Sequence, residues 1–122
     1  MAPWSFASPV FTQRPQSVVG DVGASVQLNC EISDGSQVYY FEWRRYPSNN
    51  ITYTLIDNDI RSAPPERFHR VGQYGLNITS LAASDGAMYR CMFLPSQLNA
   101  SANVFVIGVY FCLSLLWWLY HI

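Results

Sequence analysis

Apolar and polar side chains alternate with a period of two along several short segments, and this pattern limits the fold more than any other feature. The clearest segments are residues 26–30 (VQLNC), 39–44 (YYFEWR) and 76–79 (LNIT). Successive side chains of a β-strand point to opposite faces, so the alternation predicts half-buried strands. Residues 51–56 and 88–93 predict two further strands, the first because it is rich in β-branched and aromatic residues.

Turn-forming residues separate these predicted strands. Glycine, proline, serine, asparagine and aspartate cluster at residues 20–23, 33–36, 47–50, 72–75 and 84–86. A longer loop is predicted to begin at Asp57-Asn58-Asp59 and to end near Pro64-Pro65. Many short strands at this spacing predict an all-β sandwich or barrel, and no stretch before residue 100 has a helical apolar stripe.

The charged residues are few and unevenly placed. Only 12% of the 122 residues are charged, against roughly 25% in a typical soluble domain. The net charge of −1 excludes a strongly basic nucleic-acid-binding protein, and the 50% apolar content excludes a disordered chain. Every charged residue lies between Arg14 and Arg90, so the sequence predicts one water-compatible domain followed by an apolar tail.

The tail is long enough to meet a membrane. Residues 104–122 carry no charge, and as a helix they would measure about 28 Å, close to the ~30 Å core of a bilayer. Trp117, Trp118 and Tyr120 fit an interfacial aromatic belt. We expect residues 108–122 to form an apolar helix that anchors the protein, with a span that could begin near 104. A removable glycolipid-anchor signal and a truncated product are the alternatives.

The N-terminal residues 1–9 are predicted to be an extension without regular structure. Pro3, Pro9 and Pro15 interrupt any helix, and the segment lacks the basic start and unbroken apolar stretch of a secretory signal.

Three cysteines indicate one bonded pair and one further thiol. Cys30 and Cys91 lie in strand-like segments, whereas Cys112 lies in the apolar tail, where it would face lipid and is a candidate for palmitoylation. A bridge between Cys30 and Cys91 would close a loop of about 61 residues and stabilise the fold by up to ~4 kcal/mol. Two buried thiols in a reducing compartment are the alternative.

A set of spaced residues resembles the immunoglobulin superfamily, in particular its variable-type (V-set) or intermediate-type (I-set) domain. The set is Cys30, Trp43, Leu76-x-Ile78-x-x-Leu81 and Asp85-x-x-x-Tyr89-x-Cys91. The resemblance covers residues 10–107 and implies an immunoglobulin-like β-sandwich in which Trp43 packs on a Cys30–Cys91 disulfide between the sheets.

The same resemblance implies roles for several other residues. Tyr89 should hydrogen-bond back to the corner before its strand, and Arg67 should pair with Asp85 at the base of the sandwich. Strand alternation that turns Trp43 inward also turns Arg45 inward, so we expect Arg45 near Asp85 as a structural residue. Residues 100–108 lack the Phe-Gly-x-Gly bulge of antigen receptors, which favours a germline-encoded surface receptor, adhesion molecule or co-receptor.

Strand alternation predicts which side chains can meet a partner. If Trp43 and Cys91 point inward, an outward patch forms from Tyr40, Glu42, Arg44, Tyr46, Arg90 and Met92. Tyrosine, arginine and methionine are enriched at protein interfaces, and members of the resembled family commonly use this sheet. The patch is therefore a candidate face for a protein ligand or for homo- or heterodimerisation. An ordinary solvent-exposed surface with no binding role is the alternative.

Three sequons predict glycosylation at Asn50, Asn77 and Asn99. We expect Asn77 to project from the opposite sheet, where a glycan would leave the candidate ligand face free.

The sequence contains no catalytic, phosphate-binding or paired-cysteine motif, and His69 and His121 are isolated. We therefore predict no enzymatic activity, cofactor, metal or nucleic-acid partner. The predicted function is a cell-surface immunoglobulin-like receptor, adhesion or co-receptor domain at the plasma membrane, with its ectodomain outside the cell. A soluble or secreted binding domain, such as a truncated isoform or an antigen-receptor-like chain, is the alternative.

Overall fold

Short strands account for almost all of the regular structure. The computed structural model describes residues 9–48, 52–57, 60–61 and 67–108. Its strands are β1 (Phe11–Gln13), β2 (Val18–Asp21), β3 (Val26–Leu28), β4 (Glu31–Ile32), β5 (Tyr40–Tyr46), β6 (Tyr53–Asp57), β7 (Ile60–Arg61), β8 (Phe68–Val71), β9 (Gly75–Ile78), β10 (Ala87–Leu94) and β11 (Asn99–Ile107). One 3-10 turn, η1 (Ala83–Asp85), precedes β10.

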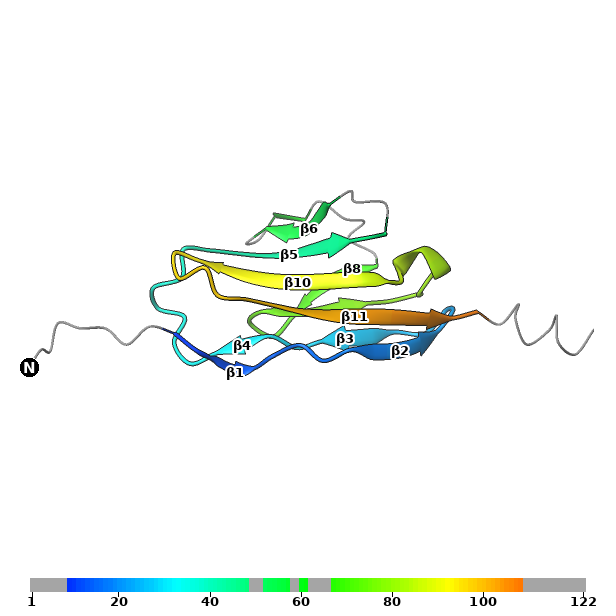
Figure 1. Cartoon of the computed structure of the whole chain (residues 1–122), viewed down its shortest axis with the longest axis horizontal. Coiled ribbons are helices and arrows are strands. Elements are labelled where there is room, and N and C mark those ends of the chain that lie inside the picture. The colour runs from blue at the N-terminus through cyan, green and yellow to red at the C-terminus, as the bar shows by residue number, and fades with distance from the viewer. Residues whose placement is uncertain (1–8, 49–51, 58–59, 62–66, 109–122) are drawn as a thin grey trace, which may run out of the picture.

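The strands form two facing layers (Figure 1). The larger layer is a six-stranded sheet in the order β2-β11-β10-β5-β6-β7. The other layer contains the three-stranded sheet β3-β9-β8, and β1 pairs with β4 beside it. All neighbouring strands are antiparallel except β2, which pairs in parallel with β11. The all-β sandwich that the sequence predicts is therefore present.

Alternating side chains from both layers fill the space between them. On β10 the inward residues are Tyr89, Cys91 and Phe93, and all three are fully buried. Leu28 and Leu76 meet them from the smaller sheet and are equally buried. A disulfide between Cys30 and Cys91 links the two layers. The two cysteines are thus bonded, and the alternative of two free thiols does not apply to this structure.

The region after β6 differs from the expected loop. Residues Ile60 and Arg61 form β7, which pairs with Ile56 and Asp57. A two-residue strand is too short to show alternation, so the sequence pattern could not reveal it. The pairing of β5 with β6 also shifts register between Trp43 and Arg44.

The two ends of the described chain leave the sandwich at opposite ends of its long axis (Figure 1). Residues 104–107 belong to β11 and pair with β2, so they are not the start of a helical span. Residues 109–122, including Cys112 and the rest of the expected apolar helix, lie outside the described residues, as do residues 1–8. Within the described part of the chain, no helix has the length and apolar character needed to cross a bilayer.

Candidate protein-interaction face

The outward side of the six-stranded sheet carries the residues that the sequence predicted for ligand binding. Residues that pair across neighbouring strands share a face of the sheet. The pairing of β11, β10, β5 and β6 therefore defines rows of outward residues. These rows are Asn99–Met92–Glu42–Asp57, Ser101–Arg90–Arg44–Thr54 and Asn103–Met88–Tyr46, and Leu94 pairs with Tyr40 at the end of β10. We call the patch formed by Tyr40, Glu42, Arg44, Tyr46, Arg90 and Met92 the interaction face.

Glu42 differs from the other residues of this face because it is covered. Alternation places it on the outward side, yet only 1% of its surface is exposed. The Tyr40 hydroxyl donates a hydrogen bond of 2.8 Å to Glu42 Oε1, and the Arg44 guanidinium forms an ion pair with Glu42 Oε2. The expectation that Glu42 contacts a ligand directly is therefore corrected, since its role here is to hold Tyr40 and Arg44.

Burial and the neighbouring carboxylates change the ionisation of Tyr40. Burial is the largest cause and, together with the hydrogen bond to Glu42 and the negative charges of Glu42 and Asp57, raises the pKa of Tyr40 to about 12. Tyr40 therefore keeps its proton at physiological pH and remains a hydrogen-bond donor to Glu42.

Arg90 and Tyr46 form the second fixed pair of the interaction face. The Arg90 guanidinium carbon lies 5.2 Å from the centre of the Tyr46 ring, within range of a cation–π interaction. Arg90 also pairs across the strands with Arg44, so the two arginines are neighbours on the sheet, with Arg44 bound to Glu42 and Arg90 over the ring of Tyr46. Both arginines are partly exposed, which leaves their charge accessible to an acidic group on a partner.

An apolar surface adjoins the interaction face and was missed by the sequence analysis. Phe105 on β11 is 53% exposed and pairs with Val19 on β2, which is 61% exposed. Ile107 and Met88 are also exposed, and we call these four residues the apolar extension. An open hollow of about 470 Å³ lies beside it, with Tyr46, Met88 and Phe105 in its lining. The alternation of small buried residues with exposed ones in residues 99–107 could have revealed this surface.

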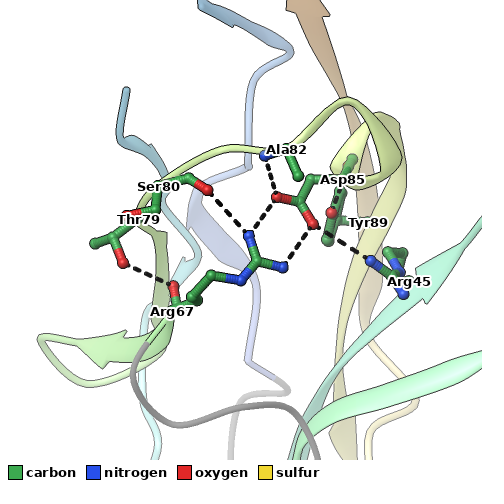
Figure 2. A network of polar contacts seen from close by, with 7 residues as sticks. All are labelled: Arg45, Arg67, Thr79, Ser80, Ala82, Asp85 and Tyr89. Carbon is green, nitrogen blue, oxygen red and sulfur yellow. Dashed lines mark hydrogen bonds and ion pairs between the residues drawn. The ribbon is translucent and has the colours of Figure 1, made fainter. Parts of the chain in front are cut away.

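The base of the sandwich is held by a buried carboxylate, that of Asp85 (Figure 2). Arg67 donates hydrogen bonds to both of its oxygens, and the backbone N–H of Ala82 donates a third at 2.8 Å. Arg45 Nη1 lies 3.6 Å from Asp85 Oδ1. The Tyr89 hydroxyl donates a hydrogen bond of 2.5 Å to the backbone carbonyl of Asp85, four residues earlier in the chain. These residues lie outside the interaction face.

The ionisation of Asp85 reflects two opposing influences. Burial is the largest cause and raises its pKa, but the hydrogen bonds from Arg67 and Ala82 and the positive charges of Arg67 and Arg45 outweigh it. The pKa of Asp85 consequently lies below its ordinary value. The carboxylate therefore stays ionised at neutral pH.

The other predicted structural residues lie in the core between the layers. The Trp43 indole N–H donates to the backbone carbonyl of Tyr74 at 2.8 Å, so this buried ring has its polar atom satisfied. The side chains of Leu76, Ile78 and Leu81 are buried in the same cluster.

The sequons lie in different places. Asn77 is half-buried on β9 of the three-stranded sheet, paired with Gln27 and His69. Asn99 is exposed at the start of β11, and Asn50 lies outside the described residues. Among the described residues, no group of three metal-ligating side chains comes together.

Comparison with known protein families gives one match over most of the chain. The model of the immunoglobulin V-set domain matches residues 13–110. Among curated proteins, Protein amalgam of Drosophila melanogaster is 29% identical over 101 residues, which cover 74% of this chain and 30% of that protein. Junctional adhesion molecule C of Homo sapiens is 32% identical over 68 residues, which cover 55% of this chain and 22% of that protein. The chain thus spans less than a third of these relatives.

Solved structures support the same fold. The crystal structure of Dpr11 IG1 bound to DIP-gamma IG+IG2 has a TM-score of 0.72 and 20% identity, covering 84% of this chain and 52% of that chain. The crystal structure of Rst D1-D2 has a TM-score of 0.66 and 23% identity, covering 84% of this chain and 50% of that chain.

Proposed function

Because this chain belongs to the immunoglobulin V-set family, a family of non-enzymatic binding domains, we propose that it is a cell-surface domain that binds a protein partner through its interaction face. Similar proteins support this proposal. One relative is a junctional adhesion molecule, and one structural neighbour was crystallised in a complex between immunoglobulin domains. The partner is either a second copy of the chain or another surface protein.

The observation that carries the proposal is the fixed arrangement of Tyr40, Arg44, Tyr46 and Arg90 on one side of the sheet. Tyrosine and arginine supply a large share of binding energy at protein interfaces. Here their orientations are already set, because Glu42 holds Tyr40 and Arg44 while Arg90 rests on the ring of Tyr46. Side chains that are ordered before binding lose less conformational entropy when a partner docks.

The proposed location is the extracellular side of the plasma membrane. The Cys30–Cys91 disulfide supports an oxidising compartment. The uncharged residues that follow β11 support attachment to a bilayer. They begin at the end of β11, which lies at the opposite end of the sandwich from the turn between β10 and β11 (Figure 1). A soluble or secreted domain is the alternative. If the 122-residue chain stays in solution without detergent, the proposed anchor in residues 108–122 is excluded.

Substitution of the interaction face tests the proposal. We would screen the full chain against surface proteins and then compare Arg44→Ala and Tyr46→Ala with the matched control Gln27→Ala on β3 of the opposite sheet. Both face variants should weaken partner binding by about tenfold or more. The melting temperature should stay close to that of the wild type in Tyr46→Ala, whereas it should fall in Arg44→Ala, because that variant leaves the buried Glu42 without its counter-charge. Binding that survives both substitutions would exclude this face as the binding site.

A further inference from the structure

Asn99 stands on the same side of the sheet as the interaction face. It is the first residue of β11 and pairs with Met92 on β10, which in turn pairs with Glu42 on β5. Neighbouring strands lie about 5 Å apart, so Asn99 is one strand from Met92 and about 10 Å from β5. Any group attached to Asn99 therefore projects beside Met92.

The local geometry leaves Asn99 able to accept a glycan. Its side chain is exposed, and the Nδ2 amide donates one hydrogen bond, of 3.0 Å, to the backbone carbonyl of Gln97. An amide nitrogen carries two hydrogens, so the second can be replaced while this hydrogen bond remains. Ser101 supplies the hydroxyl of the sequon and is exposed on the same side, two residues along the strand.

The described sequon at Asn77 has a different environment. Asn77 lies in the middle strand of the three-stranded sheet and is half-buried between Gln27 and His69. A glycan there would project from the other layer. Of the two described sequons, only the one at Asn99 places a glycan where it can affect the interaction face.

We propose that Asn99 carries an N-linked glycan that covers the Met92 end of the interaction face and leaves the end at Tyr46 and Met88 open. In the attachment step, the bond between Nδ2 and the sugar C1 forms as the bond from C1 to the diphosphate of a lipid-linked oligosaccharide donor breaks. The diphosphate keeps the electron pair, and the displaced amide hydrogen leaves as a proton.

The glycan would restrict where a partner can dock. Met88 lies four residues from Met92 along β10, about 13 Å away, so a bulky group beside Met92 leaves the surface around Met88 exposed. That surface includes Tyr46 and the apolar extension. This inference rests on the proposed function, because both the glycan and the partner require an exported domain.

Oxidation of the two methionines measures the covering directly and needs no partner. The full chain would be routed through the secretory pathway of a eukaryotic cell behind a cleavable leader, and glycan occupancy mapped by mass spectrometry. Dilute hydrogen peroxide then serves as the probe, because exposed methionine is converted to its sulfoxide. In Asn99→Gln and Ser101→Ala, Met92 should oxidise several-fold faster than in the glycosylated wild type, whereas Met88 should be unchanged.

Two matched variants distinguish an effect of the glycan on Met92 oxidation from an effect of the Asn99 side chain itself. Ser101→Ala removes the sequon but keeps Asn99 and its hydrogen bond to Gln97, so equal behaviour of both variants assigns the effect to the sugar. Asn77→Gln should leave the oxidation of Met92 unchanged. The proposal is overturned if Asn99 carries no glycan in exported protein, or if Met92 oxidises equally fast with and without it. Neither of these two results would decide whether the interaction face binds a partner, because Arg44→Ala and Tyr46→Ala test that binding separately.

Discussion

The Arg67 guanidinium donates two hydrogen bonds to the Asp85 carboxylate, one of 2.7 Å from Nη1 to Oδ2 and one of 3.1 Å from Nη2 to Oδ1 (Figure 2). Arg67 lies just before β8 of the smaller sheet, whereas Asp85 ends the turn that leads into β10 of the larger one. Asp85 has no exposed surface. The pair therefore fixes the base of one sheet to the base of the other.

Removing the carboxylate should destabilise the domain strongly. In Asp85→Ala the guanidinium groups of Arg67 and Arg45 lose their shared counter-charge, and the N–H of Ala82 loses its acceptor. Loss of one partner of a buried pair typically costs about 3–5 kcal/mol, and the partial exposure of Arg67 favours the lower figure. Urea unfolding would measure the change. The exposed control Asp21→Asn should stay within about 0.5 kcal/mol of the wild type, and a similarly small effect of Asp85→Ala would contradict the prediction.

The contribution of Asp85 should depend on pH in a definite direction. Its pKa in the folded protein lies below the ordinary value of 3.8, so folding favours the ionised carboxylate. This stabilisation is fully present above the unfolded-state pKa and is lost as pH falls through the folded-state pKa. The difference in unfolding free energy between the wild type and Asp85→Ala should therefore be constant from about pH 5 to 8 and shrink below about pH 4. An equal difference at pH 3 and pH 7 would refute this assignment.

The hydroxyl of Tyr89 should contribute to stability independently of its ring. Tyr89→Phe keeps the buried ring but leaves the backbone carbonyl of Asp85 without its 2.5 Å hydrogen bond. The expected loss is about 1–2 kcal/mol by chemical denaturation. Tyr53→Phe is the control, because Tyr53 is 40% exposed and its interaction with Arg45 uses the ring. Equal stabilities of Tyr89→Phe and Tyr53→Phe would show that the hydrogen bond from Tyr89 to Asp85 contributes nothing to the stability of the fold.

The core was predictable because its signals are local or regularly spaced. The alternation of side chains predicts that Trp43 and Cys91 point inward. The family resemblance predicts the hydrogen bond of Tyr89 to the corner before its strand and the ion pair of Arg67 with Asp85. The bulge between β5 and β6 was not predictable, because it depends on register between strands. It lets Leu55 and Ile56 both be buried although they are adjacent in sequence.

The interaction face was predictable only in part. Alternation tells which side of a sheet a residue takes, but not whether its neighbours cover it, so the burial of Glu42 was missed. The apolar extension depends on the parallel pairing of Phe105 with Val19, residues far apart in the chain. The alternation in residues 99–107 could have placed Phe105 and Ile107 on the outward side, but no short-range pattern contains their neighbour Val19.

The disulfide should be present in protein made by its native route and should support the fold. Alkylation without reductant should label at most Cys112, whereas all three cysteines should be labelled after reduction and denaturation. Replacing both Cys30 and Cys91 by serine should cost about 2–5 kcal/mol of stability. Cys112→Ser is the control and should leave the stability of the sandwich unchanged. Labelling of all three thiols without reductant would contradict the extracellular assignment.

The final prediction concerns the buried acid of the interaction face. Glu42→Gln keeps an oxygen that can accept the Tyr40 hydroxyl but removes the negative charge, so Arg44 loses its ion pair. The pKa of Tyr40, which burial and then Glu42 raise to about 12, should fall toward its ordinary value of 10 without reaching it, because the burial remains. NMR titration of the tyrosine rings would measure the change.

Tyr89 provides an internal control for that titration. Its pKa is also raised to about 12, by burial first and by the charge of Asp85, and Glu42 has no part in it. It should therefore be unaffected by Glu42→Gln. If Glu42 is what orders Arg44, the same variant should also weaken partner binding, although Glu42 is itself too buried to touch the partner. An unchanged Tyr40 pKa together with unchanged binding would show that the face does not depend on this acid.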